Sequence, residues 1–256
     1  MKLTDRVYVV TGAGGGIGQG VTEALLQQGA GGVTMVDLTA PHRTAAVVDP
    51  GGDRTLDVAA DVTSPEDAHR VVSATVKRFG RLDGLVNCAG VVFLDTAWEA
   101  AVSDWNRQLE VNVTGSFIFS RAVGGHLRDH GGGAIVNVSS NCGKAGYPNM
   151  AAYNASKAAV LGLTRSLSME WAADKINVNA VCPGGVETPM LAGVAEWLAP
   201  RLETPSAELL EQMGPAQLGR KIKPLEVGRV IAFLLSDDAL IIRGQAISID
   251  GGDTPY

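Results

Sequence analysis

The stretch that most limits how this chain can fold lies near its start, where a short apolar run passes directly into "TGAGGGIGQG". The apolar run is typical of a buried strand, and the residues after the glycines are typical of a helix. A glycine turn at that junction places backbone N–H groups and a helix dipole where a phosphate binds well. The general spacing G-x-G-x-x-G is absent, but Gly12, Gly16 and Gly18 fit G-x-x-x-G-x-G. A turn that serves only tight helix–strand packing is the alternative.

Short β-branched runs recur along the chain, with longer helix-like segments between them. The expected strands are residues 7–10, 33–36, 56–60, 85–87, 135–138, 178–181 and 247–249. The expected helices are residues 18–28, 65–79, 102–128, 151–173 and 225–235. This alternation predicts an α/β fold: a single doubly wound Rossmann-type domain over residues 1–256, with a mostly parallel seven-stranded sheet and helices on both faces. Residues 188–224 are less regular, and we expect them to form a substrate loop or lid.

Composition and charge narrow the classes of function. The net charge is −6 and no dense Lys/Arg run occurs, which argues against nucleic acid or an anionic membrane as the main partner. No apolar run approaches the ~18 residues of a membrane span, and the start lacks a signal-peptide pattern. Cys88, Cys142 and Cys182 are odd in number and widely separated, so we expect reduced thiols and a cytoplasmic protein. No Cys or His spacing resembles a metal site, and we expect no metal.

The segment "AAYNASKAAV" places Tyr153 four residues before Lys157, so that both side chains lie on one helical face. A fixed ammonium beside a phenol favours the phenolate and lowers the pKa of the tyrosine. Such a tyrosine is a usable proton donor and acceptor near neutral pH. A surface Tyr–Lys pair is the alternative, because this spacing is common on helices.

Asp37 ends the second expected strand, 19 residues after Gly18. An acid about 20 residues beyond a glycine turn of this kind binds the adenosine ribose hydroxyls of a dinucleotide. A lone Asp after a strand is otherwise a turn residue or a helix cap. Together with the glycine turn, Asp37 predicts NAD as the cofactor.

Five motifs follow one another in the order "TGAGGGIG", "NCAG", "NVSS", "YNASK" and "PGGVET". On these motifs the chain strongly resembles the short-chain dehydrogenase/reductase family, and the resemblance extends over essentially the whole chain, through "GQAISIDGG". Two departures are "NCAG", where the family often has a second Asn, and Gly20 inside the first helix.

The resemblance implies a set of catalytic residues. Tyr153 is implied to be the general acid/base, its pKa lowered by Lys157 and by the positive charge of the nicotinamide. Lys157 is also implied to bind the nicotinamide ribose, and Ser140 to hydrogen-bond the substrate oxygen, whereas Ser139 lies one residue too far from Tyr153. Asn112 is implied to hold a water that links Lys157 to solvent, although an Asn among Val residues otherwise bonds backbone.

The same resemblance implies contacts with the adenine, the adenosine ribose and the nicotinamide carboxamide. The implied residues, beyond the glycines and Asp37, are Ile17, Asp61, Val62, Asn87, Ala89, Gly90, Pro183, Gly184, Val186 and Thr188. For Asp61 a turn role after the third strand is the alternative.

We expect the substrate to lie against Ser140 and Tyr153, beside a wall made of Asn141, Cys142, Tyr147 and Met190. The loop to Met213 would form the lid. Trp197 and Leu198 either close over an apolar substrate or pack onto the body of the protein.

The predicted function is an NAD-dependent oxidoreductase that interconverts a secondary alcohol and a ketone. One alternative is an NADPH-dependent 3-oxoacyl thioester reductase, against which Asp37 and the lack of a basic residue at positions 13–15 and 38 argue. The other is a catalytically silent binding protein, which the presence of both Tyr153 and Lys157 argues against.

Two of the expected helices, 102–128 and 151–173, carry apolar residues on more than one face. A second apolar face needs a partner beyond the sheet, and members of the family pair these helices across a two-fold axis. We therefore expect a homotetramer, or a homodimer. The apolar residues concerned are Phe117, Phe119, Leu161, Leu163 and Leu167.

Overall fold

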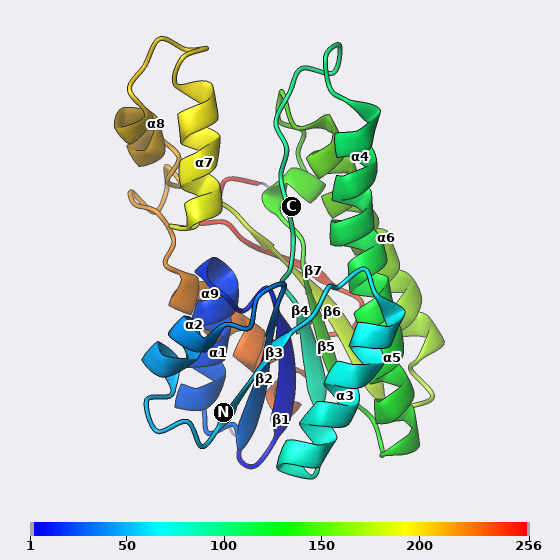
Figure 1. Ribbon diagram of the computed structural model, residues 1–256. Helices are drawn as coiled ribbons and strands as arrows, with labels where there is room; N and C mark the ends of the chain where they lie inside the picture. The colour runs from blue at the N-terminus through cyan, green and yellow to red at the C-terminus, as the bar shows by residue number, and fades with distance from the viewer. Residues whose placement is uncertain (1–2, 255–256) are drawn as a thin grey trace.

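The fold is built on one sheet of seven parallel strands, in the order β3-β2-β1-β4-β5-β6-β7 (Figure 1). The computed structural model describes residues 3–254. All seven predicted strands are present, and the order reverses between β1 and β4, the point at which such sheets bind ligands. The strands are β1 (Val7–Thr11), β2 (Gly32–Asp37), β3 (Thr55–Ala59), β4 (Gly84–Asn87), β5 (Gly133–Val138), β6 (Ile176–Pro183) and β7 (Ala246–Ile249).

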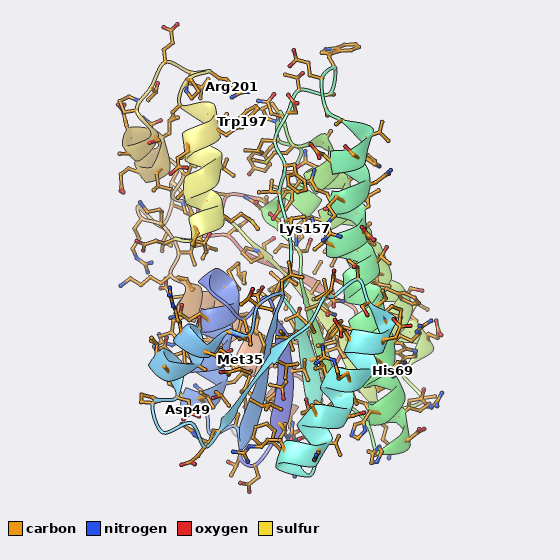
Figure 2. All side chains as sticks on the ribbon, in the orientation of Figure 1. Met35, Asp49, His69, Lys157, Trp197 and Arg201 are labelled. Atoms are coloured by element: carbon orange, nitrogen blue, oxygen red, sulfur yellow. The ribbon has the colours of Figure 1, made fainter. Side chains whose placement is uncertain are left out.

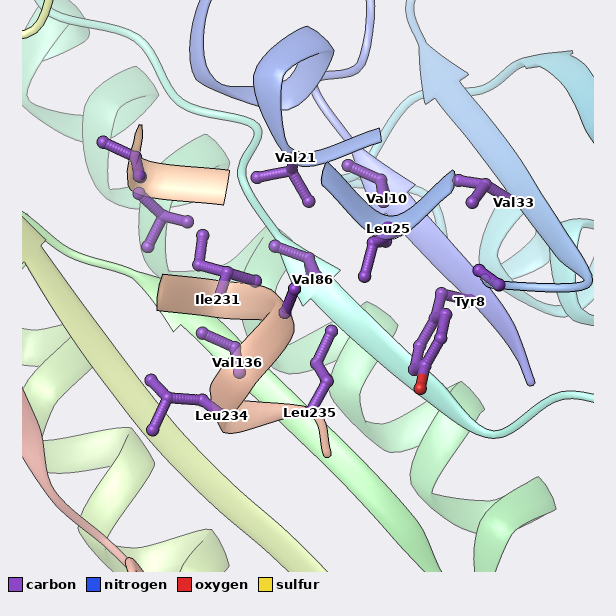
Figure 3. Close-up of a cluster of buried hydrophobic side chains, with 14 of the residues drawn as sticks. Tyr8, Val10, Val21, Leu25, Val33, Val86, Val136, Ile231, Leu234 and Leu235 are labelled. Atoms are coloured by element: carbon purple, nitrogen blue, oxygen red, sulfur yellow. The ribbon is translucent and has the colours of Figure 1, made fainter. Parts of the chain in front are cut away.

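Helices cover both faces of the sheet, as predicted. On one face α1 (Gly16–Gln27) and α9 (Pro224–Leu234) pack on the strands (Figure 3), and α2 (His42–Val48) lies beside α1. On the other face lie α3 (Pro65–Phe79), α5 (Ser116–Asp129) and α6 (Ala151–Glu170). Alternation along β1 divides its side chains between the two cores, because successive residues of a strand point to opposite faces. Tyr8 and Val10 join the first core, and Val9 joins the second.

Glycines allow α1 and α9 to approach closely. A Cβ on Gly20 would lie 2.3 Å from the carbonyl carbon of Pro224, and a Cβ on Gly228 would lie 2.3 Å from the carbonyl oxygen of Gly20. Gly20, which departs from the family pattern, is therefore a packing residue.

The helix predicted over residues 102–128 is interrupted. It divides into α4 (Val102–Leu109), a π-helical segment η1 (Glu110–Gly115) and α5. A π turn is wider than an α-helical turn, and such turns inside helices are frequent at functional sites. Asn112 lies in this segment.

Local capping at α3 agrees with the sequence. The Ser64 side chain accepts a hydrogen bond from the Asp67 N–H at the N-cap, and Gly80 has a φ of 79° at the C-cap. The short helix α2 was not predicted.

The region from 188 to 224 contains two helices, α7 (Pro189–Leu198) and α8 (Ser206–Gln212), and it is joined to the body by a bridge between Val186 and Ile222. In Figure 1 these helices stand beyond the carboxyl ends of the strands, across from α4. Within residues 3–254, none of the helices combines the length and apolarity needed to cross a bilayer.

Candidate active site

A single cavity of about 860 Å³ runs along the carboxyl ends of the strands at the β1/β4 switch point. The glycine turn after β1 and Asp37 at the end of β2 line one part of it. Tyr153 and Lys157 of α6, together with residues of α7, line another part. Every predicted cofactor, substrate and catalytic residue lines this cavity except Asn87 and Asn112.

The glycine turn leaves the start of α1 open to a ligand. Gly15 at the N-cap supplies no side-chain hydrogen bond, so no capping side chain pairs with the first N–H groups of the helix. Gly12 has a φ of +67°, and a Cβ there would lie 2.8 Å from the Cα of Ala89. These features fit the pyrophosphate of a dinucleotide, which needs close backbone approach and free N–H donors.

Asp37 lies against the same turn. Its Oδ2 accepts a hydrogen bond from the Gly14 N–H at 2.9 Å, and its Oδ1 accepts one from the Leu38 N–H at 2.8 Å. The carboxylate is thereby fixed at the cavity wall beside the glycines, in the place predicted for a ribose-binding acid.

Asp61 lies at the cavity wall and also holds the turn after β3. It lines the cavity with Val62, and its Oδ1 accepts hydrogen bonds from the Thr63 N–H at 2.9 Å and the Thr63 hydroxyl at 2.8 Å. The carboxylate therefore stabilises the turn after β3, so its contact with a cofactor stays a prediction.

Asn87 lies behind the cavity wall. Its Nδ2 donates to Asn137 Oδ1 at 2.8 Å, to Ser120 Oγ at 2.8 Å and to the Ser116 carbonyl at 3.2 Å. The side chain is buried in the interior of the protein because it points from the end of β4 toward α5. The predicted direct contact between Asn87 and the adenosine ribose therefore lacks support in this geometry.

The two serines after β5 have different partners. Ser139 Oγ donates to the Lys157 carbonyl at 2.8 Å. Ser140 Oγ donates to Asn141 Oδ1 at 3.1 Å, and the nearby serine hydroxyl acts to lower the pKa of Tyr153. The Ser139 hydroxyl is thus bonded to the backbone of α6, and the substrate contact of Ser140 stays a prediction.

Burial opposes the proton chemistry expected for Tyr153. Burial raises the pKa of Tyr153 well above its ordinary value, and this effect exceeds the contribution of Ser140. Lys157 is also buried, which lowers its own pKa. Its Nζ lies 5.5 Å from the centre of the Tyr153 ring and donates to the Val138 carbonyl at 3.0 Å. The lowered tyrosine pKa predicted from the Tyr–Lys spacing is thus wrong for these residues on their own, because removal from water outweighs the lysine.

The Asn112 carboxamide forms hydrogen bonds with backbone groups. Its Oδ1 accepts from the Val91 N–H at 2.8 Å, and its Nδ2 donates to the Val91 carbonyl and to Ser156 Oγ, each at 3.0 Å. These bonds fasten the segment after β4 to α6. A Cβ on Gly90 would lie 3.2 Å from Asn112 Oδ1 and 3.4 Å from Lys157 Nζ, so this glycine lets the two side chains approach. The water-holding role of Asn112 stays a prediction.

The cavity wall on the substrate side is largely apolar. Trp197 and Leu198 of α7 line the cavity, and the Arg201 guanidinium stacks 3.5 Å from the centre of the Trp197 ring (Figure 2). Several further wall residues were missed in the sequence, although some directly follow "NCAG" at the carboxyl end of β4, where ligands are expected. The missed residues include Val91, Val92, Leu94, Val111, Leu191 and Val194.

Comparison with known proteins settles the family. A family model described as enoyl-(acyl carrier protein) reductase matches residues 12–254. A protein called 2-(S)-hydroxypropyl-CoM dehydrogenase 3, from Xanthobacter autotrophicus, is 34% identical over 255 residues, covering 99% of this chain and 98% of its own. The chain belongs to the short-chain dehydrogenase/reductase family.

Other members of the family are similar along their full lengths. An NAD-dependent glycerol dehydrogenase from Listeria innocua is 36% identical over 254 residues, covering 99% of this chain and 95% of its own. The crystal structure of a variant actinorhodin polyketide ketoreductase with NADPH matches with a TM-score of 0.93 and 34% identity, covering 100% of both chains. This short-chain dehydrogenase/reductase is therefore an oxidoreductase with a single Rossmann-like domain, and its relatives use NAD or NADPH.

Proposed function

We propose that this protein is an NAD-dependent oxidoreductase that interconverts a secondary alcohol and a ketone. The observation that carries the proposal is the convergence of Tyr153, Lys157 and Ser140 on the cavity that the glycine turn and Asp37 also line. A bound nicotinamide cofactor supplies the hydride acceptor or donor.

The protein's own residues handle the oxygen and its proton. During oxidation Tyr153 Oη accepts the hydroxyl proton of the alcohol, and during reduction it donates a proton to the carbonyl oxygen. Ser140 Oγ hydrogen-bonds the same oxygen and holds it toward Tyr153. Because burial raises the pKa of Tyr153, its phenolate needs nearby positive charge. Lys157 supplies that charge when its Nζ, held by the Val138 carbonyl, is protonated.

Asp37 supports NAD rather than NADP. A 2′-phosphate beside this carboxylate would meet like charge. Among the cavity-lining residues of the described chain, the cationic side chains are Arg107 and Lys157. Lys157 lies beside Tyr153, and Arg107 on α4 pairs with Glu110 at 3.1 Å. The same charges disfavour an NADPH-dependent 3-oxoacyl thioester reductase.

We also infer a homo-oligomer, a tetramer or a dimer. Phe119, Leu161 and Leu167 are buried within the chain itself, so these residues do not form the unpartnered face that the sequence suggested. Phe117 of α5 and Met169 of α6 are 39% and 83% exposed, and they leave apolar surface for a second copy to cover.

The cytoplasmic location is part of this proposal. Cys88, Cys142 and Cys182 are free thiols, which fits a reducing compartment.

Cofactor reduction in the presence of secondary alcohols tests the proposed function. We expect NADH to form from NAD with at least one alcohol, and Tyr153→Phe to abolish most of this turnover while NAD binding persists. Reduction of 3-oxoacyl thioesters with NADPH alone would favour the thioester reductase. Cofactor binding without any turnover would favour the silent binding protein.

A further inference from the structure

A chain of hydrogen bonds connects Ser140 to a second hydroxyl at the cavity wall. Ser140 Oγ donates to Asn141 Oδ1 at 3.1 Å, and Asn141 Nδ2 donates to Tyr147 Oη at 3.0 Å. Asn141 is only 9% exposed, whereas Tyr147 is 38% exposed and lines the cavity. One carboxamide therefore joins the catalytic serine to a phenol that a substrate can reach.

The direction of these bonds leaves the Tyr147 proton available. A phenol carries one proton, and an oxygen that accepts from Asn141 keeps that proton for another acceptor. Within residues 3–254, Tyr147 Oη donates no hydrogen bond to a protein group. Burial raises the pKa of Tyr147, so the phenol stays protonated at neutral pH. Tyr147 thus offers a hydrogen-bond donor at the cavity wall.

The orientation of the carboxamide has independent support. The Cys142 N–H donates to Ser140 Oγ at 3.1 Å, which directs the serine proton elsewhere. Cys142 Sγ lies 3.6 Å from Asn141 Oδ1, so two donors face that oxygen. A flipped carboxamide would place its NH₂ group against the thiol and would take the Tyr147 proton instead.

The phenol is also fixed through its backbone. Asn154 Nδ2 on α6 donates to the Tyr147 carbonyl at 2.9 Å. The residue is held by Asn154 at its main chain and by Asn141 at its side chain. Because the side chain is already held in place, little conformational entropy is lost when its hydroxyl binds a ligand.

We propose that Tyr147 is a specificity-determining residue whose hydroxyl donates a hydrogen bond to a second oxygen of the substrate, with Asn141 as its positioning residue. The preferred substrates are then uncharged diols, hydroxy ketones or diketones, in which a second oxygen lies a few bonds from the reacting carbon. This inference rests on the proposed oxidoreductase function and names the substrate class of the same cavity.

Matched alcohols test the inference with NAD as cofactor. Cyclohexanol is compared with cyclohexane-1,2-diol, cyclohexane-1,3-diol and cyclohexane-1,4-diol, for the unmodified enzyme and for Tyr147→Phe. We expect at least one diol to exceed cyclohexanol about tenfold in kcat/KM, the upper range for one neutral hydrogen bond. Tyr147→Phe should remove this advantage mainly through KM and lower kcat/KM more for that diol than for cyclohexanol.

Two controls accompany the comparison. Met190→Leu changes the same wall without removing a polar group, and it should keep the diol preference. Thermal unfolding of each variant shows that the fold is retained. Asn141→Ala should reduce the diol preference and also lower turnover of cyclohexanol, because Ser140 loses its partner.

The outcomes separate this inference from the proposed function. An equal loss on cyclohexanol and the diols in Tyr147→Phe would mean that Tyr147 acts through Ser140, which overturns the inference. The inference is also overturned if Tyr147→Phe keeps the full diol preference, or if the unmodified enzyme oxidises cyclohexanol as well as every diol. Both of these outcomes leave the proposed oxidoreductase function intact. If no compound is oxidised although NAD binds, the proposed function and the inferred substrate class both fail.

Discussion

Replacing Asp37 should change which nicotinamide cofactor the enzyme prefers. Its two carboxylate oxygens are held 2.9 Å from the Gly14 nitrogen and 2.8 Å from the Leu38 nitrogen, so the carboxylate cannot move far from a bound ribose. A 2′-phosphate there brings about two negative charges. At ~4 Å and an effective dielectric near 20, one such pair costs on the order of 4 kcal/mol. Screening at this partly exposed wall reduces that cost, and a remainder of ~3 kcal/mol corresponds to a preference for NAD of about 10²-fold.

Steady-state kcat/KM with NAD and NADP measures this preference. Asp37→Ser should relax it mainly by improving NADP. Asp37→Asn keeps the shape of the side chain and removes only its charge, so it should act in the same direction if repulsion is the cause. Arg43 lies exposed on α2, six residues further on, and Arg43→Ala should leave the preference unchanged. Equal use of NADP by the unmodified enzyme would show that Asp37 does not face the ribose.

Further outcomes are expected for the catalytic base, for the packing of the helices and for the assembly. Tyr153→Phe should lower turnover at least ~10²-fold. In the unmodified enzyme the rate of alcohol oxidation should rise with pH, because burial raises the pKa of Tyr153 and the base is the phenolate. Lys157→Ala should move that rise to higher pH. Gly20→Ala should lower the free energy of unfolding by about 1–3 kcal/mol through its clash with α9. Gly162 lies on α6, and a Cβ there would meet no neighbouring atom within 4 Å. Gly162→Ala should therefore raise the free energy of unfolding by about 0.5–1 kcal/mol, which denaturant titration measures. Phe117→Glu should reduce the mass measured by light scattering, and a monomeric unmodified enzyme would contradict the proposed assembly.

The fold could be predicted from the sequence because the central strands, such as β1, β4 and β6, are buried on both faces. Such strands appear as short, nearly continuous apolar runs, and the alternation with longer segments then leaves few topologies. The limits of α3 were readable because its caps are chemical: a serine hydroxyl at one end and a left-handed glycine at the other.

Two of the elements that the sequence did not predict, α2 and η1, escaped prediction for physical reasons. The helix α2 is one of the shortest, and no side chain caps its start at Pro41, so neither periodicity nor a cap marks it. The π-helical segment η1 has the same residues that a continuous helix would have. Only the wider backbone turn distinguishes it, and this turn has no apolar signature.

The motifs located the cavity, but they did not show which side chains reach it. Asn87 and Asn112 belong to segments that follow the family pattern, yet both carboxamides bond protein groups. A carboxamide offers two donors and an acceptor, and once it is buried these groups must find partners. Whether those partners are protein or ligand depends on which neighbours lie within reach, and the sequence does not contain that information.

The same distinction between spacing and surroundings applies to Tyr153 and Lys157. Their spacing correctly places a cation near the phenol, 5.5 Å from the ring centre to Nζ. Burial then acts on each group separately, raising the pKa of Tyr153 and lowering that of Lys157, since each charged form loses water. A phenolate beside an ammonium has the same net charge as a phenol beside an amine. The ion pair is therefore favoured only as far as mutual attraction and fixed hydrogen bonds offset the lost hydration of both ions. The Val138 carbonyl provides one such bond to the ammonium, and the Ser140 hydroxyl acts to lower the pKa of Tyr153, so the proton of Tyr153 depends on these neighbours as well as on Lys157.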